Sequence, residues 1–144
     1  MSDTPSLAAR RLARIARRAR TLALFYFVVL FAATHVPAPP SSVVSVNDKL
    51  LHFGGYAVLT ICVLVCWELT IGYLEPKHYF AVWLVGILYG AVDEITQVPV
   101  RRTCDVNDWI ADVLGVVCGL LVYRLARAAW QRIAGGGPFP LSKT

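Results

Sequence analysis

The segment YFAVWLVGILYGAVDEITQ, residues 79–97, is almost wholly apolar until it ends in two adjacent carboxylates and an amide. An apolar run of this length is typical of a helix that crosses a lipid bilayer. Charged side chains in such a helix turn toward other helices or toward water, because contact with lipid is energetically costly. The segment therefore predicts a membrane-spanning helix whose polar end meets polar groups on neighbouring helices.

The composition of the whole chain agrees with a membrane protein. Of its 144 residues, 57% are hydrophobic and 16% are charged, which is too apolar for an ordinary soluble domain. Hydropathy predicts four spans, at residues 22–36, 50–67, 79–92 with a polar extension to 97, and 109–125. The expected fold class is all-α, a four-helix transmembrane bundle.

Lysine and arginine residues predict the orientation of these spans. They concentrate before the first span, between the second and third, and after the fourth, and short loops rich in such residues stay on the cytoplasmic side. Both termini are therefore expected inside, in a multi-pass protein of the cytoplasmic (inner) membrane. Glu68, near the inner end of the second span, is expected to pair with a cytoplasmic cation. This topology accounts for the net charge of +5, so no nucleic-acid partner is expected.

Composition also divides the chain into three segments. Residues 1–20 are rich in arginine with apolar residues at helical spacing, which predicts a basic amphipathic helix on anionic lipid headgroups. Residues 21–127 form the predicted membrane domain. Residues 128–144 are expected to be a flexible C-terminal tail.

Carboxylates concentrate at one end of the predicted bundle. Six of the nine acidic residues fall at span ends assigned to the outer side. Helical positions i, i+4, i+7 and i+11 share one face, which groups Asp93 with Gln97 on the third span and Asp108 with Asp112 on the fourth. Asp112 lies about 6 Å deeper than Asp108 at 1.5 Å per residue, so it is expected to be the most deeply buried acid.

Glycines continue these two faces toward the bilayer centre. Glycines spaced four residues apart let helix backbones approach closely within a membrane. The glycine-lined halves are therefore expected to pack together, and the polar halves are expected to form an outward-facing acidic cleft. The expected packing glycines are Gly86, Gly90, Gly115 and Gly119.

A short internal repeat connects the second and fourth spans. NDKLLHFGG (residues 47–55) and NDWIADVLG (residues 107–115) share asparagine, aspartate, a later polar residue and a final glycine. Two helix pairs related by an axis along the membrane normal would produce this pattern, and chance similarity is the alternative. The repeat places His52 at the position that corresponds to Asp112.

These motifs together resemble the VanZ-like family of small bacterial membrane proteins, whose founding members are associated with teicoplanin resistance. The resemblance rests on DKLLHFGGY, DEITQ, RR and DVNDWIADVLG and covers about the last two thirds of the chain. It implies a role in the bacterial cell envelope and does not imply a reaction. The chain departs from the family pattern at Asp112, where asparagine is usual, so the resemblance assigns Asp112 no role. The family pattern marks Asp48, Lys49, His52, Asp93, Glu94, Gln97, Arg102, Asp108 and Gly115.

The first interpretation of the polar residues is a binding site. Intramembrane polar residues converge on ligands and transport paths, and the ligand here would be a membrane lipid, a lipid-linked cell-wall intermediate or a glycopeptide-related molecule. Arginines would hold phosphate, and carboxylates would hold an amine, a hydroxyl or a bridging cation. The residues expected to bind are Asp48, Lys49, His52, Asp93, Glu94, Gln97, Arg101, Arg102, Asp105, Asp108 and Asp112.

The second interpretation is a metal-dependent hydrolase or transferase acting on a lipid-linked phosphate or ester. His52 would be the general base, oriented by Asp48, with Glu94 as a further catalytic candidate. A divalent cation would be the cofactor, held by Asp93, Glu94, Asp108 and Asp112.

The third interpretation is structural, and all three stay open at this point. Asp48 and Asp108 would cap helices, His52 would donate to an acid, and Asp93 or Glu94 would pair with Arg101 or Arg102. Such contacts between membrane helices contribute about 0.6 kcal/mol each on average.

Overall fold

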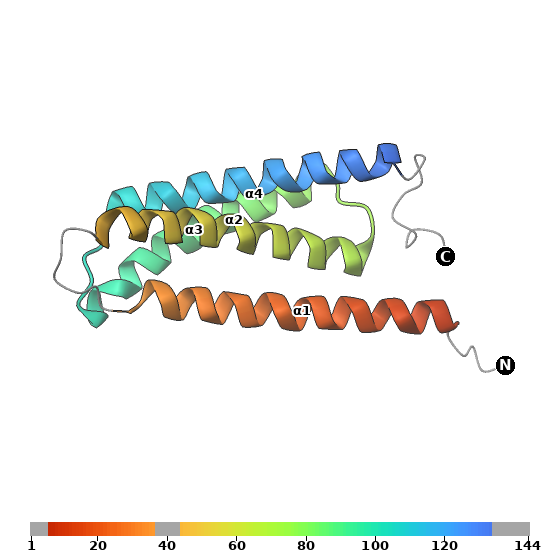
Figure 1. The fold of residues 1–144 in the computed structure, drawn as a ribbon, viewed down its shortest axis with the longest axis horizontal. Coiled ribbons are helices and arrows are strands. Elements are labelled where there is room, and N and C mark those ends of the chain that lie inside the picture. The colour runs from red at the N-terminus through yellow and green to blue at the C-terminus, as the bar shows by residue number, and fades with distance from the viewer. Residues whose placement is uncertain (1–5, 37–43, 134–144) are drawn as a thin grey trace.

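The structure, a computed structural model, describes residues 6–36 and 44–133, apart from the side chains of residues 44–47. Its described residues form four long helices, and consecutive helices run in opposite directions (Figure 1). The first turn of α1 and the last turn of α4 therefore lie at the same end of the bundle (Figure 1). The elements are α1 (Leu7–Thr34), α2 (Val44–Ile71), α3 (Pro76–Gln97), the short 3-10 helix η1 (Val98–Val100) and α4 (Val106–Ile133).

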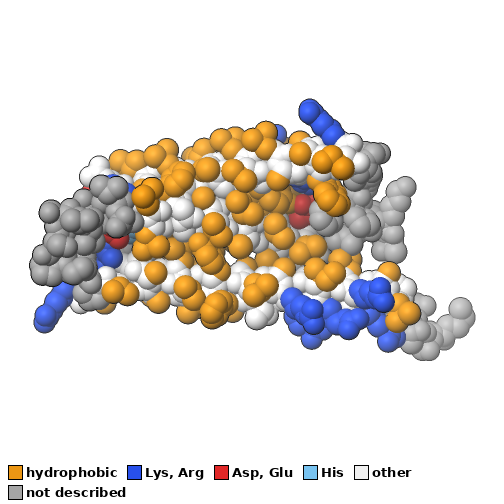
Figure 2. All heavy atoms as spheres, viewed as in Figure 1, with side chains coloured by type: hydrophobic (Ala, Val, Ile, Leu, Met, Phe, Trp, Pro, Cys, Tyr) orange, Lys and Arg blue, Asp and Glu red, His pale blue; other side chains and the backbone are white. Residues whose placement is uncertain are grey.

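Three segments of this bundle are long and apolar enough to cross a membrane. They are Asp48–Ile71, Pro76–Val100 and Val106–Ile133, which confirms three of the four predicted spans by length and composition. Hydrophobic side chains cover the middle of the molecule between its two ends (Figure 2). The first predicted span, residues 22–36, lies mostly in α1, which is not among these three segments. A fourth crossing therefore stays a prediction.

Helix α1 joins two segments that the sequence predicts as separate elements. It runs without interruption from Leu7 to Thr34, starting where the Ser6 side chain accepts a hydrogen bond from the Ala9 backbone N–H at 3.2 Å. Lysine and arginine side chains gather over its N-terminal part (Figure 2). The basic residues and the following apolar residues thus share one helix, and residues 1–5 of the predicted basic segment lie outside the described part.

Helix α4 extends further than the sequence analysis predicts. It ends at Ile133, so the first residues of the expected tail, from 128 onward, are helical. These residues have good helix propensity, and Arg132 in the last turn interacts favourably with the helix dipole. Within the expected tail, glycine occurs only after Ile133. The rest of the predicted tail, residues 134–144, lies outside the described residues.

Glycines set the distance between α2 and α4. A Cβ atom added at Gly115 would overlap the carbonyl oxygen of Phe53, and one added at Gly119 would lie 2.5 Å from the carbonyl oxygen of Ala57. The two helix backbones are therefore in direct contact. The glycines of α3 instead face side chains of α4, because a Cβ at Gly86 would lie 2.8 Å from Val116 and one at Gly90 would lie 3.1 Å from Asp112.

Substitution of Gly115 by alanine is expected to lower the thermal stability of the protein in detergent. The added methyl group overlaps backbone rather than a flexible side chain, so the helices must separate, at a cost of about 1–3 kcal/mol. The measurement is the fraction of protein that stays monodisperse after heating. Gly54→Ala is the matched control, because a Cβ at Gly54 meets nothing within 4 Å. Equal losses for both variants would contradict the close contact.

Candidate functional site

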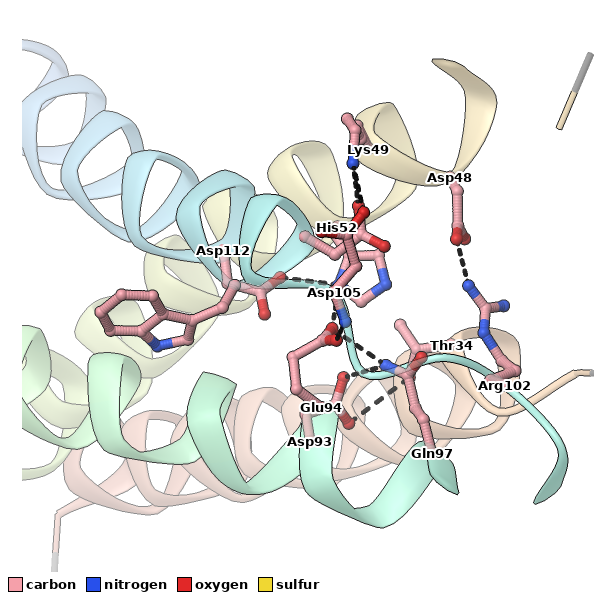
Figure 3. Close-up of polar contacts among 12 residues, drawn as sticks. Thr34, Asp48, Lys49, His52, Asp93, Glu94, Gln97, Arg102, Asp105 and Asp112 are labelled. Carbon is pink, nitrogen blue, oxygen red and sulfur yellow. Dashed lines mark hydrogen bonds and ion pairs between the residues drawn. The ribbon is translucent and has the colours of Figure 1, made fainter. Parts of the chain in front are cut away.

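A buried group of polar side chains lies at the end of the bundle where α3 finishes and α4 begins (Figure 3). Three helices contribute to it, and none of its members is more than 2% exposed. We call this group the acidic cluster. It consists of His52 from α2, Asp93, Glu94 and Gln97 from α3, and Asp112 from α4.

His52 lies at the centre of the acidic cluster. Its Nδ1 atom is 2.9 Å from Oδ1 of Asp112 and 3.7 Å from Oε1 of Glu94. The two residues at corresponding positions of the internal repeat, His52 and Asp112, are thus in direct contact. In the enzyme interpretation Asp48 would orient His52, but no hydrogen bond joins these two side chains among the described residues. Asp48 pairs with Arg102 instead, and Asp112 is the hydrogen-bonding partner of His52.

The carboxylates of α3 are held by a chain of hydrogen bonds. The Gln97 amide donates to Oδ2 of Asp93 at 3.4 Å and to Oε1 of Glu94 at 3.2 Å. The second oxygen of Glu94 accepts from the Asp105 backbone N–H at 2.9 Å. These bonds link the end of α3 to the connection that leads into α4, and so fix where the acids point (Figure 3).

Helix α1 supplies two contacts that the sequence analysis missed. The Thr34 hydroxyl, which is fully buried, donates to Oδ1 of Asp93 at 3.4 Å. The His35 ring lies 3.9 Å from the same oxygen and hydrogen-bonds with the Thr96 hydroxyl at 3.1 Å. Their position in the sequence could have indicated these contacts. Both residues stand at the end of the first apolar run, at the same end of the bundle as the acids that end the third apolar run.

Five charged residues flank the acidic cluster, and we call them the rim. Lys49 donates to Asp108 at 2.7 Å and to Asp105 at 3.1 Å. Arg102 pairs with Asp48 and also donates to the Val36 carbonyl at 3.1 Å. The rim cations are thus engaged with rim acids. The rim consists of Asp48, Lys49, Arg102, Asp105 and Asp108.

Asp105 holds the connection between η1 and α4 in place. Its carboxylate accepts hydrogen bonds from the backbone and side-chain amides of Asn107 at 2.8 and 2.9 Å. The backbone hydrogen bond from Asn107, and then the contact with Lys49, lower the pKa of Asp105. Asp105 therefore stays ionised and keeps Lys49 at the rim.

Two predicted arginine contacts are not found. The structural interpretation expected Asp93 or Glu94 to pair with Arg101 or Arg102, but Arg102 pairs with Asp48. Arg101 has a left-handed backbone conformation, with φ 63°, at the end of η1. This turn directs its exposed side chain away, so among the described residues Arg101 takes no part in the acidic cluster or the rim.

Several buried atoms of the acidic cluster have no hydrogen-bond partner among the described residues. They are Nε2 of His52, Oε1 of Gln97 and Oδ2 of Asp112, all on side chains with 0% exposure. Buried polar atoms are nearly always paired, and exceptions point to a missing ligand, ion or water. The acidic cluster thus has unused capacity to bind a polar group.

Comparison with known proteins identifies the family of the chain. A family model described as VanZ/LLP1 matches residues 9–127. The chain belongs to the VanZ-like family. The match includes the acidic cluster, the rim and most of α1, and so extends beyond the two thirds covered by the resemblance in sequence motifs. No curated protein and no solved structure matches the chain.

The VanZ-like acidic cluster has ligand types suited to a hard divalent cation. One atom from each of His52, Asp93, Glu94 and Asp112 can be chosen so that all four lie within 4.8 Å of one another. Carboxylate oxygens with a single imidazole suit magnesium, manganese or calcium better than soft metals. Asp108, also predicted as a metal ligand, lies in a second such group with Asp48 and His52. His52 belongs to both groups.

Proposed function

We propose that this VanZ-like protein binds the headgroup of a membrane lipid or lipid-linked cell-envelope molecule in the acidic cluster, together with a cation. The proposal places both termini in the bacterial cytoplasm and the acidic cluster at the outer margin of the cytoplasmic membrane. It includes lipid-linked cell-wall intermediates and glycopeptide-related molecules among the possible ligands. What supports it most is the convergence of three carboxylates and an imidazole, with unpaired polar atoms, at a buried point.

The charge of the acidic cluster explains why it needs a ligand. Asp93, Glu94 and Asp112 carry up to three negative charges, and the two nearby imidazoles, His52 and His35, supply at most two positive charges. Carboxylates that are buried without compensation are strongly unfavourable. The rim cations are occupied by rim acids. An ammonium group or a divalent cation would supply the missing positive charge.

The test is the composition of the protein after gentle purification. Wild-type protein is expected to retain a bound lipid and a cation by native mass spectrometry and elemental analysis. Glu94→Gln is expected to reduce the retained lipid and the retained cation at least tenfold, because the substitution removes the negative charge and keeps the shape of the side chain. Glu75→Gln is the matched control, since Glu75 is exposed and pairs with Lys77 at 2.8 Å outside the site. Equal retention in all three proteins would contradict the proposal.

A metal-dependent hydrolase or transferase is the second candidate. It is favoured by the 4.8 Å grouping of four ligand atoms. If the carboxylates alone held a divalent cation, the cation would lower the pKa of a coordinated water, and Nε2 of His52, which has no partner among the described residues, could accept a proton. Release of soluble phosphate from a lipid phosphate, dependent on added magnesium or manganese and lost in Asp112→Asn, would support this candidate over binding alone.

The proposed orientation can be tested with a natural cysteine. Cys104 is exposed and lies between η1 and α4, at the acidic-cluster end. A membrane-impermeant maleimide is expected to label Cys104 in intact cells, and Cys104→Ser should remove that label. In the Cys104→Ser background, Lys77→Cys places a thiol at the opposite end of the bundle, where labelling should require opened cells. The reverse pattern would place the acidic cluster in the cytoplasm.

A further inference from the structure

An apolar groove runs along the bundle from the acidic cluster toward the opposite end. Its volume is about 480 Å³. Helix α2 forms its floor, and α1 and α3 form its walls. Leu24 of α1 and Val85 of α3 line the two walls and are 64% and 63% exposed. The groove is therefore open along its side, between its two walls, toward the surroundings of the bundle.

The groove has the length of one membrane leaflet. On its floor it extends from Tyr56 to Trp67, which is about 16 Å along α2 at 1.5 Å per residue. The hydrocarbon core of a bilayer is about 30 Å thick, so this length corresponds to about half of it. Spread over that length, the volume gives a cross-section of about 30 Å². That is enough room for one extended hydrocarbon chain.

The groove ends at two tyrosines, one helical turn from the acidic cluster. Tyr56 follows His52 by one helical turn, and Tyr89 precedes Asp93 by one turn. Both tyrosines line the groove, and their stacked rings lie 5.9 Å apart. The Tyr56 side chain is 1% exposed, and its hydroxyl has no hydrogen-bond partner among the described residues. Polar atoms, a free hydroxyl and an apolar channel thus follow one another along the bundle.

This order matches the order of parts in an ester-linked lipid. We infer that the groove holds one acyl chain of a glycerophospholipid whose headgroup occupies the acidic cluster, while its other chain stays in the bilayer. The Tyr56 hydroxyl then donates to the ester carbonyl at the boundary between them, and so gains the partner that it lacks. The inference rests on the proposed function and names the class of its ligand.

The test uses a phosphatidylethanolamine with a photoreactive diazirine in one acyl chain, incorporated into nanodiscs with the full-length protein. Cross-links are expected on the groove walls, at Leu24 and Val85, at least tenfold above those on exposed residues elsewhere, such as Leu114. Ala81→Phe fills the groove from α3 and should remove the excess. Even labelling of all exposed apolar positions, unchanged by Ala81→Phe, would overturn the inference.

Two further variants keep the outcome interpretable. Ala23→Phe fills the same groove from α1 and should act like Ala81→Phe, which covers the case in which one variant fails to fold. Ala126→Phe adds the same ring at an exposed position of α4 outside the groove and should leave the cross-links unchanged. Preferential labelling of the groove by a polyprenyl phosphate probe, which has no ester carbonyl, would overturn the assignment to glycerophospholipids.

Failure of the inference and failure of the proposed function give different results. If Ala81→Phe removes the groove cross-links and Glu94→Gln does not, the acyl-chain site stands and headgroup binding at the acidic cluster falls. If Glu94→Gln loses the retained lipid and Ala81→Phe keeps both the lipid and the cross-links, headgroup binding stands and the acyl-chain site falls. Loss of the groove cross-links in both variants supports the two together.

Discussion

The double substitution Asp93→Asn with Asp112→Asn is expected to raise the stability of the ligand-free protein and to abolish its response to divalent cations. Neutral groups of the same shape remove buried charge that no cation compensates, and the desolvation of such charge costs several kcal/mol per ion. Two hydrogen bonds survive, because the amide oxygen introduced at position 93 can still accept from Thr34, and His52 can still bond an oxygen at position 112. The unpaired Oε1 of Gln97 can accept from the new amide at position 93 after a flip, which replaces the hydrogen bond that Gln97 donates to Glu94.

The measurement is thermal unfolding in detergent, with and without magnesium, manganese or calcium. Wild-type protein should gain about 2.7 kcal/mol when a bound cation is present at a hundred times its dissociation constant. The double variant should gain nothing. Glu75→Gln should behave like wild type, since it removes a charge far from the acidic cluster. A double variant that is less stable than wild type without cation would show that the two acids serve packing.

Replacement of Arg127 by methionine is expected to lower the free energy of unfolding by about 3–5 kcal/mol, because it leaves a buried charge unpaired. Arg127 Nε lies 2.6 Å from Oε1 of Glu68, and the Tyr123 hydroxyl donates to the other oxygen of Glu68. The Arg127 and Glu68 side chains are only 11% and 8% exposed. This ion pair joins α2 to α4 at the opposite end of the bundle from the acidic cluster.

Chemical denaturation in detergent measures this loss, and two variants show its origin. Adding Glu68→Gln to Arg127→Met should recover most of the stability, since no unpaired charge remains. Arg124→Met should cost little, because Arg124 is exposed and lies 5.7 Å from the centre of the Tyr79 ring without a buried acid as partner. Similar losses for Arg124→Met and Arg127→Met would show that general arginine packing, and not the ion pair, provides the stability.

The contrast between these two ends of the bundle bears on function. At one end Glu68 has a cation and a hydroxyl as partners, as the sequence analysis expected of a carboxylate near cytoplasmic cations. At the other end Asp93, Glu94 and Asp112 share two imidazoles, those of His52 and of His35, and have no lysine or arginine partner among the described residues. The same chain thus compensates one buried acid fully and leaves three others short of positive charge. That difference is why we assign headgroup binding to the acidic cluster and not to the site of Glu68.

Helical periodicity and hydropathy were sufficient to predict the helices, three apolar spans and the residues that share each helix face. Asp93 and Gln97 had to lie on one face of α3, and Asp108 and Asp112 on one face of α4, because a residue's direction around a helix depends only on its position. The cost of charge in lipid then required these faces to turn inward. The depth of Asp112, fully buried in the structure, follows from the same argument.

Only the tertiary structure decided which of these inward-facing groups touch. The contacts depend on the distance between the helices and on the rotation of each helix about its axis. In the structure His52 bonds Asp112 and not Asp48, Arg102 pairs with Asp48, and Thr34 donates to Asp93. That geometry is set where Gly115 and Gly119 meet the backbone of α2, and where α1 stands off α3 to leave the groove. Periodicity acts within one helix, whereas contacts between helices depend on the shapes of all four at once.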